Sequence, residues 1–327
     1  MAEKPKKRPD SLQGQVAGHF LPQPPISPSY FSMLQGPGTN KLTQITLKRK
    51  QPPVDPITGT ATINYGNLTV AIENFMKLAS GGPRVSTYKL FDLCAIALTQ
   101  LNSYRTTAEP KTVVVISLDD YMEHFGIPMT KPSRDKARRR VKEDLDFLFN
   151  MSMSWQEGAG EHARDYKTRI ISAREIQNSK IYVEFSLGMA TYLTNAYIMP
   201  YPSALFKTDD RIPSAYHIGK KLALHFSMTN NQKKGTANLI SVKSLLDAAP
   251  DIPSYKDVME KDRHLSQRII TPFEKALNSL PAFLAEWRYV GPKGVPLSND
   301  QKENFDYSVF IECYIQFELV SAPQLPG

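Results

Sequence analysis

One stretch of the sequence, residues 131–148 (KPSRDKARRRVKEDLDFL), constrains the fold most, because it combines dense positive charge with an apolar stripe. Seven of its first twelve residues are basic. Pro132 and Ser133 stand where a helix would begin, since proline is tolerated in a first turn and serine can cap free amides. The apolar residues recur at helical spacing, at Ala137, Val141, Leu145 and Leu148. We therefore predict a basic helix with one buried face and one face open to phosphate.

The residues before this stretch predict a second, shorter helix. The run ISLDDYMEHFGI (116–127) has Gly126 as its last residue but one, which suits a helix end, and a short proline-containing connection follows it. Two helices joined in this way are typical of a helix-turn-helix.

Both halves of the chain repeat one order of elements. In the first half, a long buried helix (TYKLFDLCAIALTQLN) and a strand (KTVVVISL) precede the two helices. Three strand-like runs follow, MSMSWQE, AGEHARDYKTRIISAREI and SKIYVEFS, and then a closing helix at 187–193. Helix, strand, helix, helix and β-hairpin make a winged helix.

The second half gives the same order from about residue 200. A helix at 212–230 precedes NLISVKSLLDAA, a strand and a small helix. A longer helix follows within DIPSYKDVMEKDRHLSQRIITPFEKALNSL, and then the strands AFLAEWRYVG and NFDYSVFIECYIQFELV. The predicted fold class is therefore α+β, with two tandem winged-helix domains at 61–198 and 199–327.

Residues 1–60 are predicted to be a mostly disordered basic arm. Proline, glycine, serine and glutamine dominate its first forty residues, a composition that does not bury enough surface to order itself. KPKKRP near the start could touch phosphate or remain a solvated tail. KLTQITLKRK (41–50) alternates like a short strand, and residues 61–80 predict a strand followed by an amphipathic helix.

Charge and cysteine content limit which partners and which cellular compartment the protein can have. A net charge of +8 and a pI near 9.2 favour a polyanionic partner, which charge alone does not assign to nucleic acid or to an anionic membrane. No apolar run reaches the about 18 residues that span a bilayer, and the N-terminus lacks a signal-peptide core. Cys94 and Cys313 lie in apolar runs, so we expect reduced core residues. We expect a cytoplasmic protein without a membrane partner.

The long helix of the second half carries side chains suited to reading bases. One face holds Leu265, Ile269, Phe273, Ala276 and Leu280, and the opposite face holds His264, Gln267, Arg268, Thr271 and Lys275. Arginine and glutamine can pair with guanine and adenine edges in the major groove. Pro272 predicts a kink or a new helix start, because it removes one hydrogen bond.

The two helices therefore suggest a division of labour. Lys136, Arg139, Arg140 and Lys142 would position the protein on phosphates, while the second helix reads bases. Arg164, Lys167 and Arg169 are candidate wing contacts, or else charges at a strand edge that discourage aggregation. An ordinary solvated helix face is the alternative interpretation for both helices.

Motifs of catalysis are missing from the sequence. It contains no GxxxxGK[ST] loop, and its six histidines form neither an HxH pair nor an HExxH helix. Asp119 with Asp120 and Asp209 with Asp210 suit a helix first turn and a turn. We expect a protein that is not an enzyme and that needs neither cofactor nor metal.

Taken together, the two halves resemble the plasmid replication initiators that bind iteron repeats through tandem winged-helix domains. The matching segments of the first half are ISLDDYMEHFGI, RDKARRRVKEDLDFL and IYVEFS followed by MATYL. Those of the second half are YHIGKKLALHF, ISVKSLLD and RHLSQRIITPFEKALNSL, whose Pro272 falls where this family also tends to have one. The resemblance covers residues 85–320, and the long N-terminal extension and the Gly-rich insertion at 157–160 depart from the family.

The resemblance implies binding to double-stranded origin DNA, origin opening and recruitment of a host helicase or initiator protein. It also implies a monomer–dimer equilibrium in which the dimer represses. The DNA face that it implies comprises Lys131, Ser133, Arg134, Lys136, Arg139 and Arg140 in the first domain, and Arg263, His264, Gln267, Arg268, Thr271 and Lys275 in the second. A tandem winged-helix transcriptional regulator and a partition adaptor that contacts a protein are the alternatives left open.

Overall fold

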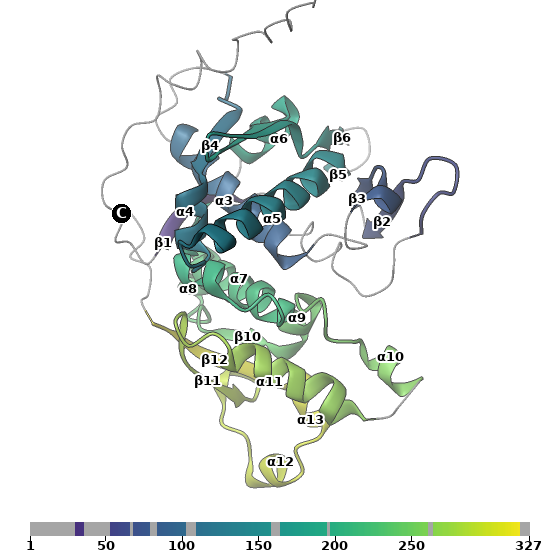
Figure 1. The fold of residues 1–327 in the computed structure, drawn as a ribbon. Coiled ribbons are helices and arrows are strands. Elements are labelled where there is room, and N and C mark those ends of the chain that lie inside the picture. The colour runs from purple at the N-terminus through teal and green to yellow at the C-terminus, as the bar shows by residue number, and fades with distance from the viewer. Residues whose placement is uncertain are drawn as a thin grey trace, which may run out of the picture.

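The computed structural model describes residues 30–35, 53–65, 68–78, 84–102, 109–157, 164–194, 197–260 and 264–320. Within them, two winged-helix domains follow one another along the chain, as the sequence predicts (Figure 1). Their sheets have the strand orders β4-β8-β7 and β10-β12-β11, so the last strand lies in the middle of each. The fold class is α+β, with two tandem winged helices.

The first domain is built around a helix that is buried almost throughout. Its elements are α3 (Val85–Asn102), β4 (Val113–Ser117), α4 (Leu118–His124), α5 (Lys131–Asn150), β7 (Ile171–Gln177), β8 (Lys180–Phe185) and α6 (Leu187–Thr194). The Ser117 side chain caps α4 by accepting from the amide of Asp120. Gly126, with a φ of +64°, turns the chain after α4, as the sequence predicts.

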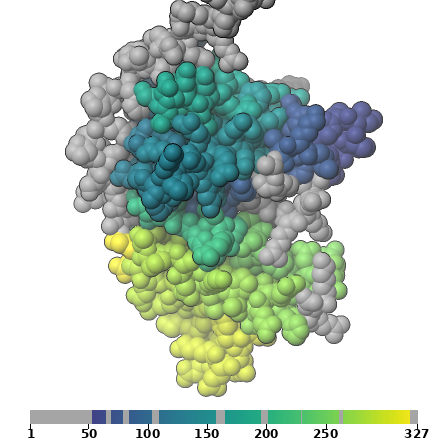
Figure 2. Space-filling view, viewed as in Figure 1, coloured from purple at the N-terminus to yellow at the C-terminus, as the bar shows by residue number. Residues whose placement is uncertain are grey.

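A second sheet interrupts the first domain between α5 and β7. Its order is β2-β3-β5-β6, built from β2 (Ala61–Tyr65), β3 (Leu68–Ile72), β5 (Met151–Glu157) and β6 (Arg164–Arg169). The expected helix within residues 61–80 is wrong: Val70 and Ile72 are buried at alternate positions of β3, and only the 3-10 turn η1 (Phe75–Lys77) follows. The sheet protrudes from one side of the molecule (Figure 2).

The second domain runs from α7 to the last strand. It comprises α7 (Pro213–Ser227), α8 (Thr229–Lys233), β10 (Leu239–Ser241), α9 (Val242–Asp247), α10 (Tyr255–Met259), the π-helix η5 (Ser266–Ile270), α11 (Thr271–Asn278), β11 (Leu284–Val290) and β12 (Tyr314–Leu319). The strand predicted within residues 304–320 is a strand only in its second part, β12. Its first part is the helix α13 (Tyr307–Glu312), which Asp306 caps.

The segment between the domains is itself paired. β9 (Tyr197–Pro202) lies antiparallel to β1 (Tyr30–Gln35) over six residues, and the 3-10 helix η4 (Ser203–Lys207) follows. β1 falls within the predicted disordered arm, so that part of the prediction is wrong. The rest of the arm before Pro53, with the strand expected at 41–50, lies outside the described residues.

Buried charges join the first helices of the two domains. Asp92 of α3 is fully buried and accepts from Lys220 Nζ of α7 at 2.7 and 2.8 Å. The hydroxyl of Tyr216, also on α7, donates to the same carboxylate and accepts from Tyr201 at 3.1 Å. Since these partners satisfy the carboxylate only when α3 and α7 lie together, the contact fixes how the two domains pack.

Lys220→Met tests how much this contact contributes to the free energy of unfolding. Leaving Asp92 buried without its cation is expected to lower the free energy of unfolding by about 3 to 5 kcal/mol. Urea denaturation measures the loss, and Asp92→Leu combined with Lys220→Met is expected to recover most of it. Lys256→Met, which removes an exposed i,i+4 pair with Glu260, is the control and should leave stability unchanged.

His217 makes the same interface sensitive to acid. Burial lowers its pKa from 6.5 to about 3, and Lys220 and Lys89 add to the effect. The unfolded chain therefore binds a proton where the folded chain does not, so stability is lost as pH falls below 6.5. Between pH 7 and 5 the loss is expected to be about 2 kcal/mol from this group. Urea midpoints of His217→Gln should fall less over that range; an equal fall would contradict this prediction.

Candidate nucleic-acid interface

α5 is capped three residues before the serine that the sequence suggested as its cap. The side chain of Thr130, not of Ser133, accepts from a backbone amide, that of Ser133, and Pro132 stands in the first turn. The predicted stripe is buried, with Ala137, Val141, Leu145 and Leu148 at 2% exposure or less. This packing against α3 leaves the opposite face of α5 to solvent.

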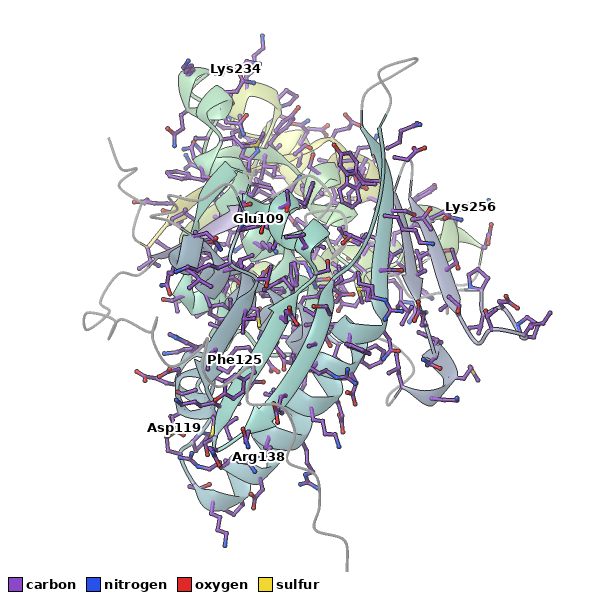
Figure 3. The ribbon with its side chains drawn as sticks, turned by 90° about the horizontal axis from the view of Figure 1, so that it is seen from above. Glu109, Asp119, Phe125, Arg138, Lys234 and Lys256 are labelled. Carbon is purple, nitrogen blue, oxygen red and sulfur yellow. The ribbon has the colours of Figure 1, made fainter. Side chains whose placement is uncertain are left out.

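That exposed face is strongly basic. Lys131, Lys136, Arg138, Arg139 and Lys142 are all exposed, and in the part of the chain that the structure describes no carboxylate forms an ion pair with them. Arg138 was not among the residues predicted to contact DNA. Its position within the run of basic residues could have indicated that it would be exposed with them. Figure 3 shows Arg138 at the same end of the molecule as Asp119.

The other three predicted residues of α5 are engaged within the protein. Arg134 forms an ion pair with Asp119 of α4, and the Ser133 hydroxyl bonds with that of Thr130. Arg140 is half-buried and pairs with Asp210, in the segment that leads into α7. These three positions therefore brace α5, and their expected contact with DNA stays a prediction.

The structure does not place the predicted wing residues in the wing. The wing position of the first domain is the β7–β8 hairpin, whose two-residue turn holds Asn178 and Ser179 at φ values of 49° and 60°. Lys167 and Arg169 lie instead on β6, and the side chain of Arg164 is outside the described residues. Arg169 pairs with Glu73 at 2.6 Å. After α5 the chain completes the second sheet before it enters the wing, which the strand pattern alone did not reveal.

The second candidate helix is wider at its start than an α-helix. Residues Ser266–Ile270 form a π-helix, closed by the amide of Thr271 donating to Ser266, and α11 then begins with Pro272 in its first turn. The sequence predicted a kink or a new start at Pro272. The backbone stays helical through Ile270 and Thr271, and what changes at Pro272 is the hydrogen-bonding pattern, from π-helix to α-helix. A π-helical turn tolerates the missing amide and is often found at functional sites.

The predicted two faces of this second helix are both present. Ile269, Phe273, Ala276 and Leu280 are buried, and Leu265 is half-buried. His264, Gln267, Arg268, Thr271 and Lys275 are exposed together on the other side, and Arg263 lies outside the described residues. This exposed row offers both cationic and amide groups of the kind that bind base edges.

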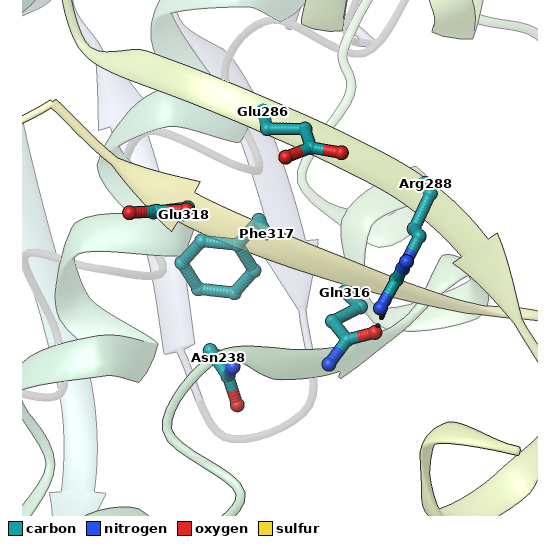
Figure 4. Close-up of a pocket in the computed structure, with 6 residues that line it drawn as sticks. All are labelled: Asn238, Glu286, Arg288, Gln316, Phe317 and Glu318. Atoms are coloured by element: carbon teal, nitrogen blue, oxygen red, sulfur yellow. Dashed lines mark hydrogen bonds between the residues drawn. The ribbon is translucent and has the colours of Figure 1, made fainter.

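The wing of the second domain is long and folded. Between β11 and β12 the chain forms η6 (Pro292–Gly294), α12 (Asn299–Glu303) and α13. Ser298 and Gln301 close a reciprocal capping box at α12. A hollow on the sheet nearby is lined by Asn238, Glu286, Arg288, Gln316, Phe317 and Glu318, with Arg288 Nε donating to Gln316 at 2.9 Å (Figure 4). Its two carboxylates make it a poor site for phosphate.

The described residues contain neither a cluster of metal ligands nor a membrane-spanning helix. Across the described parts of the chain, no group of three or more histidine, cysteine, aspartate or glutamate side chains could hold a metal ion. No helix there is long and apolar enough to cross a bilayer.

Comparisons with known proteins found similar solved structures but no matching family. No model of a known protein family matches the sequence, and no curated protein does. A crystal structure of domains 2 and 3 of RctB is similar at 9% identity and a TM-score of 0.44, covering 86% of this chain and 98% of its own. A second structure of these domains has 9% identity and a TM-score of 0.37, over 70% and 82% of the two chains.

The third similar structure is a single domain. It is the WH1 domain of MSBI1.176, a replication protein isolated from a multiple sclerosis patient, at 17% identity and a TM-score of 0.27. It covers 37% of this chain and 88% of its own.

Arg139→Ala tests whether the exposed face of α5 binds phosphate. We expect weaker binding to every duplex. The slope of the logarithm of the binding constant against the logarithm of the salt concentration should become less steep by about one, because one phosphate contact is lost. Titration of a random-sequence duplex at several salt concentrations measures both. Arg211→Ala is the matched control, since the side chain of this exposed arginine bonds, among the described residues, to its neighbour Asp209 alone. An unchanged salt slope for Arg139→Ala would rule out a phosphate contact there.

Proposed function

We propose that the protein is a replication initiator that binds double-stranded origin DNA in a sequence-specific way. The observation that carries the proposal is a pair of exposed helices, the basic α5 and the mixed η5–α11, each at the recognition-helix position of one of two packed winged-helix domains. The recognition helix is the element that enters the major groove in helix-turn-helix domains. The net charge of +8 supports a polyanionic partner.

The two helices have different parts in this proposal. α5 anchors the protein through phosphates, because the ammonium and guanidinium groups along its exposed face can pair with phosphate oxygens whatever the base sequence. The row that contains Gln267, Arg268 and Thr271 reads bases. The protein then opens the adjacent duplex and recruits host replication proteins, and a dimer represses its own synthesis.

Selection of duplexes from a random library tests sequence-specific binding. We expect one preferred sequence, repeated in the DNA beside the gene at intervals of about 20 base pairs, two helical turns. Gln267→Ala is expected to relax the preference by about 1 to 3 kcal/mol at one position, whereas Arg139→Ala weakens all duplexes equally. Equal losses for both variants on selected and random DNA would contradict the division of labour.

Opening of the duplex separates initiation from transcriptional regulation. Permanganate reacts with unpaired thymines, so a supercoiled plasmid that carries the selected repeats should become reactive beside them when the protein is added. The same plasmid without the repeats is the control. Specific binding without new reactivity would favour a regulator that uses the same surfaces.

A further inference from the structure

Asp210 lies at the point where the chain passes from the first domain to the second. It stands between η4 and α7, and its two carboxylate oxygens bond to two different helices of the first domain. Lys89 Nζ of α3 lies 2.7 Å from Oδ1, and the guanidinium of Arg140 on α5 pairs with Oδ2. Lys89 also donates to the carbonyl of Thr208 at 2.6 Å. The linker is thus bonded to α3 and α5 at two adjacent points.

The cation at the centre of this contact is buried. Lys89 is 1% exposed, and burial lowers its pKa while Asp210 opposes that shift. A buried ammonium must keep its partners, because leaving it unpaired is costly. The Asp210 carboxylate is therefore held in one place. The carboxylate of the partly exposed Asp209 beside it accepts hydrogen bonds, among the described residues, from Arg211 alone.

From Asp210 the contacts continue to the base-reading helix. Three residues after Asp210, α7 begins. At Gly219 of α7 the backbone comes so close to Leu205 of η4 and Leu280 after α11 that an added side chain would collide with Leu205. α11 packs directly on α7. An unbroken path of packed groups therefore runs from Arg140 on α5, through Asp210 and α7, to α11.

We propose that Asp210 is a positioning residue that acts together with the Asp92–Lys220 contact. It holds the linker on α3 and α5, and so helps to set the separation of α5 and α11 and the spacing of the two DNA segments that one molecule contacts. The proposal rests on the proposed function, in which both helices bind duplex DNA. It assigns Arg140 to the linker rather than to phosphate. Removing the carboxylate loosens the spacing requirement without touching any group that faces DNA.

A series of duplexes with altered spacing tests this role. The selected site is lengthened by one to five base pairs between the segments protected by the two domains. For the unchanged protein we expect a drop in affinity of at least about tenfold at five added base pairs, because half a helical turn puts the two grooves on opposite sides. For Asp210→Asn the drop should be about threefold or less, with weaker binding at the original spacing.

Two further variants sharpen the comparison. Asp209→Asn removes the same charge from the neighbouring residue and should keep the spacing profile of the unchanged protein. Arg140→Gln leaves Lys89 paired with Asp210, so we expect this variant to fold even if Asp210→Asn does not. Its affinity should likewise depend less on the spacing of the two DNA segments. If Asp210→Asn instead tightened binding to all duplexes while Arg140→Gln weakened it, with both profiles unchanged, Arg140 would be a direct phosphate contact and the proposal would be overturned.

A distance measurement without DNA separates this proposal from the proposed function. Spin labels on Gln177→Cys and Lys302→Cys, exposed positions of the two domains, report the distance between them. Cys94 and Cys313 are buried, and burial raises the pKa of the Cys94 thiol to about 12, so they should stay unlabelled. We expect a broader distance distribution for Asp210→Asn than for Asp209→Asn. Equal distributions refute the positioning role; a broader one, with no specific DNA binding by the unchanged protein, refutes the proposed function alone.

Discussion

The fully buried carboxylate of Asp92 is the interaction on which the arrangement of the two domains depends. Its partners, Lys220 and Tyr216, belong to the other domain, so separation of α3 from α7 would leave a charge without a partner in an apolar interior. Hydrophobic contact alone tolerates sliding, whereas this contact is satisfied in one geometry. The apolar core that continues from one domain into the other is consistent with a single packed body.

The two sides of α5 differ in character. Its apolar side packs on α3, and its first turn is braced by Thr130 and, through Arg134, by α4. Arg140 ties the same helix to the linker. The exposed cations of α5 are thereby carried on a helix fixed at several points, which favours a surface whose charges keep constant positions relative to one another.

Much of the fold follows from periodicity in the sequence, and the failures have physical causes. The stripe that ends in Leu148 and the glycine at 126 marked α5 and α4, because burial and positive φ leave strong local signals. Nothing local shows that β3 pairs with β5 some eighty residues later, so β6 was assigned to the wing. The pairing of β1 with β9 is equally non-local. Arg140 looked like its neighbours, and only the position of Asp210 distinguishes it.

The two wings differ greatly in size: a two-residue turn at Asn178 and Ser179 in one domain, and a connection with three short helices in the other. Because the two domains differ and follow one another head to tail, the chain has no two-fold axis. Palindromic DNA sites, by contrast, match proteins that have such an axis. A single copy of this chain would therefore lie on a duplex with a defined polarity. Successive copies on a row of identical sites would all point the same way, giving the assembly a front and a back.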